Sequence, residues 1–555
     1  MLKTKGLLYV LLSTLLIGKV SCYEYEPVLG QQYIQFPTST NNSLAQKYFI
    51  LGLAHLHSFG YQYAIEQFEK AINLDSKFAM AYVFLSLSYI QPVWLEEDSN
   101  GGWKQVERMN SNIDFANLAR KEQLYVQAIR KLFGDGLTIR YDDYICLLKE
   151  LYALFPTDNE IGLFLVAVLF RRTQPEIRGY LHRSPQDIES QMNILSSVLK
   201  SNPDHPGALH YFTHVYDQPL TALSALSNAM KYSRIASSSP HAQHMVSHLH
   251  LRLGLFQSAL LSNLESDETG GNLQRELHSV EFMHYIYLNM GKRTIALQLL
   301  ENIKPFFVNG SFYRMQYGIM YDRHIVETQN YSFPFENPFD LINCSECKTL
   351  GDLLWLYQIN SGLLLVKGFS TVKNDQYYNL TLVQNYIRQL SSMSIQVNQT
   401  EPTLSISIMA MQLQLRAFHQ YYRLAKTNEE KAIALDYAQM ASELELSVNP
   451  PCYGPPIDPV KPSQELFGEL LLENKQYSDA IDQFLNVMAY FPNRTLTLIG
   501  LARGYSLLNQ TDLARSYYSR LMNDLLAKSD YGLSWYEEAY NYLSNTSRDI
   551  FKSVL

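Results

Sequence analysis

The sequence predicts an all-α protein, a tetratricopeptide-type helix–turn–helix solenoid wound into a right-handed superhelix. A 34-residue pattern begins at residue 45, and its positions 4, 7, 8, 20, 24 and 27 are Tyr48, Leu51, Gly52, Ala64, Phe68 and Ala71. The pattern returns near the C-terminus, where positions 8, 20, 24 and 32 are Gly468, Ala480, Phe484 and Pro492, and positions 8, 11, 20 and 24 of the next repeat are Ala502, Tyr505, Ala514 and Tyr518. Runs of alternating β-branched residues, which would indicate strands, are scarce throughout.

The first 22 residues are predicted to form a secretory signal peptide. Lys3 and Lys5 precede a short apolar run, and Val20-Ser21-Cys22 has the small residues of a cleavage site. The apolar run is too short for a membrane span, and no later stretch approaches 20 apolar residues. A bacterial lipoprotein anchor on Cys22 is the weaker alternative, because Lys19 stands where such signals need an apolar residue. We therefore expect a secreted or lumenal protein without a transmembrane segment after signal cleavage.

Apolar spacing and residue composition divide the rest of the chain into helical repeats, a loop and a proline-rich crossing. Tetratricopeptide-like repeats are predicted over 42–329, with helices over 124–132, 144–155 and 186–199 and a polar insertion at 96–102 that breaks the repeat. An Asn-, Pro- and Phe-rich loop or insertion follows at 330–348, and further helical hairpins at 349–448. Six prolines mark a crossing at 449–463, because proline excludes regular helix, and C-terminal repeats occupy 464–555.

The charge of the chain argues against nucleic-acid binding, and its cysteine and Asn-x-Ser/Thr content fits a secreted protein. A net charge of −8 with scattered basic residues gives no sign of nucleic-acid binding. Cys344 and Cys347 are expected to form a local disulfide, since a secreted protein favours this over a redox or metal role. Glycosylation is expected at Asn-x-Ser/Thr acceptors, which are Asn41, Asn309, Asn330, Asn343, Asn379, Asn398, Asn493, Asn509 and Asn545.

Nine of the fourteen histidines lie between residues 201 and 293. If repeats start at Pro206, Pro240 and Leu277, many of these histidines and two acids take positions 2, 5, 9 and 12, which line the concave groove of tetratricopeptide arrays. Spacings of three and four residues place each set on one face of its helix. The predicted groove residues are His210, His214, Asp217, His244, His248, His278 and Glu281, with His241 as a further candidate. In the first and last repeats these positions lack such residues, so the polar lining is local to the middle.

Imidazoles at i and i+4 with a nearby carboxylate are typical of transition-metal sites. Without thiolates, such a set suits zinc, iron, manganese or copper and does not select among them. The structural alternative is that the histidines bond to one another and to the carboxylates across a tight superhelix. We weigh a metal or catalytic role evenly against a structural or organic-ligand role, and expect His205, His250 and His284 to be ordinary.

From about residue 44 onward the chain resembles a family of large tetratricopeptide proteins found in bacteria and some eukaryotes, whose function is largely unassigned. The sequence segments on which the resemblance is based are Ala64-Ile65-Glu66-Gln67-Phe68, Asp204-His205-Pro206-Gly207-Ala208-Leu209-His210-Tyr211 with His214, His244-Met245-x-Ser247-His248 and Glu276-Leu277-His278. The resemblance implies the repeat fold and the histidine motif but no activity. Cys452-Tyr453 departs from the Trp-Tyr that relatives tend to have.

Two functions follow as hypotheses. The first is a secreted scaffold that binds a protein, peptide or small-molecule ligand in a concave, His-rich groove. The second is a metalloprotein, such as a metal-dependent hydrolase or oxidase, whose site is built from the groove residues. No catalytic-serine elbow, phosphate-binding glycine loop or H-E-x-x-H motif is present, so the first hypothesis, without enzyme activity, is preferred.

Overall fold

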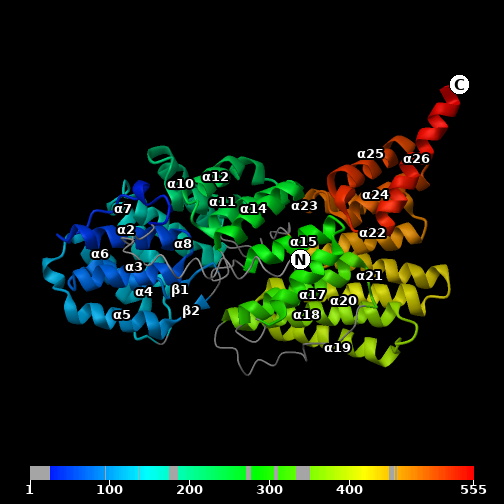
Figure 1. Cartoon of the computed structure of the whole chain (residues 1–555). Helices are drawn as coiled ribbons and strands as arrows, with labels where there is room; N and C mark the ends of the chain where they lie inside the picture. Colours follow the sequence, from blue (N-terminus) through cyan, green and yellow to red (C-terminus); the bar gives the residue numbers. More distant parts are fainter. Residues whose placement is uncertain are drawn as a thin grey trace, which may run out of the picture.

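The computed structural model describes residues 26–554, apart from 94–95, 137, 174–184, 271–276, 306–310, 333–349, 449–454 and 457–458. It is an all-α tetratricopeptide-type solenoid in which consecutive helices pack side by side (Figure 1). The N-terminal helices are α2 (Ser43–His57), α3 (Tyr61–Leu74), α4 (Ala79–Leu87), α5 (Ser99–Asn112), α6 (Arg120–Phe133), α7 (Tyr141–Leu154), α8 (Asn159–Thr173) and α10 (Pro185–Ser201). The helices expected over 124–132, 144–155 and 186–199 are confirmed as α6, α7 and α10.

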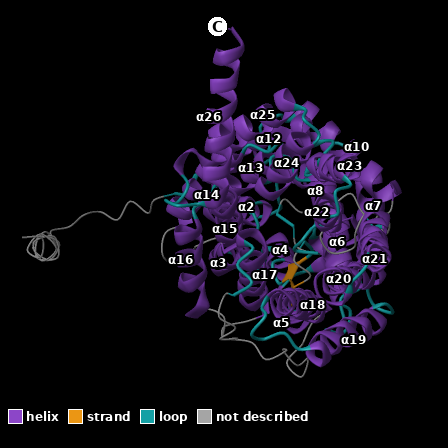
Figure 2. Ribbon diagram, turned by 90° about the vertical axis from the view of Figure 1, so that its right-hand side faces the viewer, coloured by secondary structure: helices purple, strands orange, loops and turns teal. Residues whose placement is uncertain are grey.

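The central and C-terminal helices continue the array. The central ones are α11 (Pro206–Tyr216), α12 (Ala222–Ile235), α13 (Pro240–Arg252), α14 (Phe256–Gly270), α15 (Leu277–Asn289), α16 (Arg293–Ile303) and α17 (Ser311–Thr328). The later ones are α18 (Leu350–Lys373), α19 (Leu380–Val397), α20 (Pro402–His419), α21 (Asn428–Ser447), α22 (Ser463–Glu473), α23 (Tyr477–Tyr490), α24 (Thr495–Leu507), α25 (Thr511–Arg520) and α26 (Ser534–Val554). Helix α26 projects from the rest of the molecule (Figure 2). Short 3-10 or π-helical segments are η1 (Gln31–Tyr33), η2 (Phe115–Asn117), η6 (Gln420–Leu424), η7 (Leu521–Leu525) and η8 (Leu526–Lys528).

Close packing within a helical pair explains the repeat pattern. A Cβ atom placed on Gly52 of α2 would lie 2.5 Å from Cε1 of Phe68 on α3, so only glycine lets these helices approach as they do. Ala64, also on α3, is fully buried. Gly468 and Phe484 form the same contact between α22 and α23, with a corresponding distance of 3.0 Å. The residues at positions 8, 20 and 24 therefore form the close contacts between paired helices that the repeat pattern predicts.

The segment expected as a polar insertion at 96–102 forms a short strand and the start of a helix. Strands β1 (Ile90–Gln91) and β2 (Glu96–Glu97) pair antiparallel. Helix α5 then begins at Ser99, because the side chain of Asp98 accepts a hydrogen bond from the backbone N–H of Gly101 at 2.7 Å and caps the helix.

The N-terminal segment and the C-terminal repeats both pack against the middle of the solenoid. Near the N-terminus, the backbone N–H of Val28 donates to Oγ of Ser238 at 2.9 Å. From the C-terminal repeats, Asn493 Nδ2 donates to the carbonyl of Gly254 at 2.9 Å, and the N–H of Thr495 donates to Oδ1 of Asn289 at 2.9 Å. The solenoid therefore curls on itself, and its central helices are covered from several sides.

Several sequence predictions fall outside the described residues. These are the signal peptide at 1–22, most of the loop at 330–348, part of the crossing at 449–463, and Cys344, Cys347 and Cys452. None of the helices that the structure describes has the length and hydropathy to cross a membrane. Two expected glycosylation acceptors have structural contacts: Asn379 caps α19 through Leu382 N–H, and Asn493 bonds to Gly254.

Candidate metal centre

The predicted groove histidines come from three successive first helices of the repeats. His210 and His214 lie on α11, His241, His244 and His248 on α13, and His278 on α15. Helices α11 and α13 each begin with a proline after a capping side chain, His205 and Ser239, which fixes where the helix starts. In Figure 1 the central helices, in green, lie between the N-terminal and C-terminal groups.

The structure sorts these six histidines into two triads, in each of which one ring nitrogen per histidine lies within 4.8 Å of the others. Triad 1 is His210, His214 and His241, and triad 2 is His244, His248 and His278. Each triad takes two histidines one helical turn apart on one helix and a third from the start of the next repeat's first helix. His244 and His248 stand one 34-residue repeat after His210 and His214, so the two triads are copies of one arrangement.

These side chains do not line an accessible surface of the concave groove in which the sequence placed them. All six histidines, together with Asp217 and Glu281, are at most 7% exposed. Helices α2 and α8 pack on α11 and cover triad 1, and the ring of Phe59 lies 4.5 Å from that of His210. Phe282 lies against triad 2, with its ring centroid 4.7 Å from that of His248. The centre is an interior site and not a surface for a peptide.

Two of the Nδ1 atoms of triad 2, those of His244 and His248, have acceptors that fix the tautomers. Nδ1 of His244 lies 2.6 Å from Oδ1 of Asn263, whose Nδ2 donates to the carbonyl of Ala259 at 2.9 Å and so fixes the orientation of the amide. Nδ1 of His248 lies 2.8 Å from Oδ2 of Asp217. Both Nδ1 atoms therefore donate, and both Nε2 atoms of the neutral rings carry a free lone pair.

These two lone pairs face each other. Nε2 of His244 and Nε2 of His248 are 2.9 Å apart. Burial lowers the pKa of His244 well below its ordinary value, and His248 and His278 lower it further. Burial also lowers the pKa of His248, against the opposing effect of Asp217. A bridging proton is therefore disfavoured at neutral pH, and two acceptors at this distance repel unless a cation lies between them.

Triad 1 has a similar convergence of ring nitrogens. Nδ1 of His210 donates to the backbone carbonyl of His57 at 2.6 Å, so its Nε2 carries a lone pair. That Nε2 lies 3.0 Å from Nε2 of both His214 and His241. Nitrogens about 2.0–2.1 Å from one ion lie about 3 Å apart at a right angle and about 3.4 Å apart at the tetrahedral angle. The observed separations are thus close to those of ligands that share an ion.

The two carboxylates lie behind the rings and not among the converging nitrogens. Asp217 accepts from Nδ1 of His248 and, at 2.9 Å, from Nε of Arg252. Glu281 pairs with Arg323, and its Oε2 lies 3.4 Å from Nδ1 of His278. Although burial favours the neutral acids, Arg252 and His248 hold the pKa of Asp217 below its ordinary value, and Arg323 and His278 lower that of Glu281 to about 2. Predicted as candidate ligands, Asp217 and Glu281 instead orient the imidazoles.

A third buried group, His57, Glu160 and His205, was not predicted from the sequence. Nε2 of His57 and Nε2 of His205 each lie 2.7 Å from a different oxygen of Glu160. Here the carboxylate already satisfies both ring nitrogens, unlike in the triads. The group supports triad 1, because the carbonyl of His57 holds His210. His205, expected to be ordinary, therefore belongs to this network.

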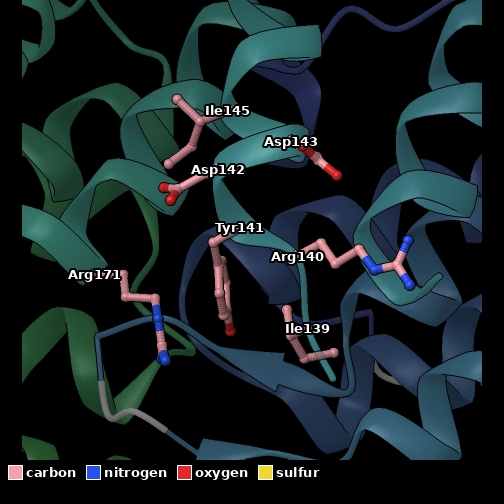
Figure 3. A pocket seen from close by; sticks show the side chains of 7 residues that line it. All are labelled: Ile139, Arg140, Tyr141, Asp142, Asp143, Ile145 and Arg171. Carbon is pink, nitrogen blue, oxygen red and sulfur yellow. The ribbon is translucent and has the colours of Figure 1, made fainter. Parts of the chain in front are cut away.

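A surface cleft of about 470 Å³ lies at the start of α7 (Figure 3). Its lining residues are Ile139, Arg140, Tyr141, Asp142, Asp143, Ile145 and Arg171. Arg171 pairs with Glu97, and its guanidinium lies 4.2 Å from the centroid of the Tyr141 ring. Asp142 and Asp143 occupy the first turn of α7, where the helix dipole stabilises acids. Packing accounts for these residues, so the cleft is not the candidate site.

Comparisons with known proteins find only distant similarity, which carries no argument about this chain. No protein-family model matches the chain, and no curated protein matches it. Among solved structures, yeast Tom70 is 12% identical with a TM-score of 0.33 and covers 91% of this chain and 96% of its own. A monomeric IFIT1 mutant with Gppp-AAAA is 12% identical with a TM-score of 0.32, covering 94% and 93%. The P58(IPK) TPR domain is 11% identical with a TM-score of 0.19, covering 84% and 99%. The repeat fold is therefore established by the helical pairs of this chain alone.

Proposed function

We propose that this protein is a metal-binding protein that holds two transition-metal ions in its central repeats, one in each triad. The observation that carries the proposal is the 2.9 Å separation of the Nε2 atoms of His244 and His248, two rings whose Nδ1 atoms each face an acceptor oxygen. The repeat relation of the two triads supports two equivalent ions. The proposal includes export of the protein from the cell, because a signal peptide is predicted at its N-terminus. A peptide in an open groove is not retained, because the histidines are buried.

Elemental analysis of the purified, tag-free protein tests this proposal. The wild type should carry two equivalents of transition metal, and His214→Gln or His278→Gln should each lose one, because a triad with two nitrogens binds an ion much more weakly. The double variant His214→Gln/His248→Gln should carry none.

His284→Gln is the matched control for His278→Gln, because His284 lies on the same helix, is equally buried and belongs to neither triad. It should keep two equivalents. Circular dichroism establishes that each variant remains helical. A folded wild type without stoichiometric metal, or a double variant that keeps its metal, would refute the proposal.

A further inference from the structure

An apolar cavity lies beside triad 1. It has a volume of about 30 Å³, and its walls come from helices α2, α3, α4, α7, α8 and α11 and from strand β1. The described residues that line it are aliphatic or aromatic, and none of them is charged at neutral pH. Most are buried, whereas Pro92 and Ala167 are half-buried and mark the side that faces solvent. The cavity therefore suits a small apolar molecule and not an ion or a peptide.

The volume of the cavity limits the size of its occupant. A water molecule needs about 10–15 Å³ of such space, so the cavity holds a molecule of about two or three non-hydrogen atoms. A water molecule among these side chains would lose most of its hydrogen bonds, and apolar cavities in proteins stay dry and take up apolar gases such as xenon. An apolar diatomic molecule fits both the size and the lining.

The ring of Phe59 separates the cavity from triad 1. It lines the cavity and also contacts all three rings of the triad, at centroid distances of 4.5 Å to His210, 5.5 Å to His214 and 5.2 Å to His241. Tyr211 is a second shared wall, since it lines the cavity and its ring centroid lies 5.3 Å from that of His210. A molecule in the cavity is therefore one side chain away from triad 1.

The backbone at Phe59 holds this ring in an unusual place. Phe59 has a φ of 56°, in the left-handed region, two residues after the end of α2. The equivalent turn residues after α13, α15, α22 and α24 are Gly254, Gly291, Lys475 and Asn509. Glycine and asparagine adopt this conformation at low cost, whereas a bulky apolar residue does so rarely. The position of the ring, between the cavity and the triad, accounts for a phenylalanine at this turn.

We propose that the cavity binds a small, uncharged, apolar molecule of the size of dioxygen and is the route by which this molecule reaches triad 1, past the ring of Phe59. The destination of the molecule rests on the proposed metal-binding function, whereas its binding in the cavity does not. Elemental analysis keeps the two apart, because a protein without metal refutes the metal-binding function while the cavity is still decided by the measurements below.

Xenon, an apolar probe of the cavity alone, tests the binding step. Diffraction from crystals of the full-length protein under xenon pressure should show a xenon atom beside Phe59 and Phe164, two residues that line the cavity. Ala167→Leu enlarges a side chain in the cavity wall and should abolish this peak, whereas Ala167→Gly, the matched control at the same position, should keep it. No xenon in the wild-type cavity, or an unchanged peak in the Ala167→Leu variant, would reduce the cavity to a packing void and overturn the proposal.

Dioxygen itself tests the route, because it is paramagnetic and speeds the relaxation of nearby protons. The reporters are the protons on Nδ1 of His210 in triad 1 and of His244 in triad 2, each of which is bonded to a buried acceptor. In metal-free and in zinc-loaded protein, both diamagnetic, dioxygen pressure should speed relaxation of the His210 proton several-fold more than that of the His244 proton. Ala167→Leu should remove the difference. Equal effects at the two protons in the wild type would refute a route to triad 1.

Phe59→Gly tests the ring as the barrier. The backbone tolerates this change, because glycine stands at the equivalent turns after α13 and α15. Loss of the ring should make a chelator remove the ion of triad 1 several-fold faster. Triad 2 is the internal reference, since Phe282, the ring that contacts it, does not line the cavity. Unchanged release from triad 1 in a folded, metal-loaded variant would contradict a route that passes Phe59.

Discussion

At the residue scale, the partner of the Nδ1 atom of an imidazole determines what its Nε2 atom can bind. An acceptor on Nδ1 fixes the proton there and leaves Nε2 free for a metal ion, as Asn263 does for His244 and Asp217 for His248. The carboxylate that pairs two histidines in the third group has the opposite effect, because it occupies the Nε2 side and satisfies it.

Asp217→Asn tests this role of the outer groups. An asparagine can present either its oxygen or its amide nitrogen to His248 and no longer balances Arg252, so the tautomer of His248 is less well fixed. We expect the metal affinity of triad 2 to fall by about 10- to 100-fold while triad 1 keeps its affinity, as measured by chelator competition. Asp204→Asn, a substitution of the partly exposed partner of Lys231, is the control and should change neither triad. Equal weakening of both triads would contradict the assignment.

The residue types of the site were largely predictable from the sequence, but their roles were not. Repeat numbering identified all six histidines, because positions 2, 5 and 9 recur on one face of successive helices. The repeat positions do not determine side-chain rotamers. The rotamers decide which ring nitrogens converge and which carboxylates bond to the histidines instead of lying among those nitrogens. His57 and Glu160 were missed for another reason: they are 103 residues apart in the chain, and no local pattern links them.

At the scale of elements, helix α13 connects the two halves of the centre, since it contributes His241 to triad 1 and His244 and His248 to triad 2. Regular helix-to-helix spacing is therefore required for both triads to form. The spacing depends on small residues where helices touch, and these were readable from the 34-residue pattern.

Gly52→Ala and Gly468→Ala form a graded test of this packing. The added methyl group would lie 2.5 Å from the fully buried ring of Phe68 in the first case and 3.0 Å from that of Phe484 in the second. We expect Gly52→Ala to lower the free energy of unfolding by about 1–3 kcal/mol, as overpacked cores do. Gly468→Ala should be near neutral, because the helix propensity of alanine, up to about 1 kcal/mol better than that of glycine, offsets the milder contact. Denaturant unfolding measures both, and a larger loss for Gly468→Ala would contradict this order.

At the scale of the whole molecule, contacts between distant repeats decide the environment of the centre. The sequence predicted a solenoid with a His-rich concave groove, but α2 and α8 pack on α11 and the C-terminal repeats pack on α15 and its neighbours. The contacts of α2 with α11 and of the C-terminal repeats with α15 join residues more than 100 positions apart and depend on the accumulated curvature of the repeats, which a single-repeat pattern does not specify. A surface groove was therefore expected where the structure has an interior site.

Arg494 is the clearest of these long-range contacts. It is fully buried, donates from Nε to Glu465 at 2.7 Å and also pairs with Glu327, so it joins α24 to α22 and α17. Arg494→Met leaves two buried carboxylates without this partner, and we expect a loss of about 3–5 kcal/mol in the free energy of unfolding. Arg503→Met removes a partly exposed pair with Glu538 and should cost less than about 1 kcal/mol. Similar losses for the two variants in thermal and denaturant unfolding would show that this buried network does not hold the repeats together.

The most direct measurement of the central claim is anomalous X-ray diffraction from crystals of the metal-loaded protein at the absorption edge of the bound element. We predict two anomalous peaks, one among the Nε2 atoms of His210, His214 and His241 and one among the ring nitrogens of His244, His248 and His278, with no peak at His57, Glu160 and His205. A single peak elsewhere, a peak at the Glu160 group, or triads without anomalous density in protein that elemental analysis shows to contain metal would contradict a two-ion histidine centre.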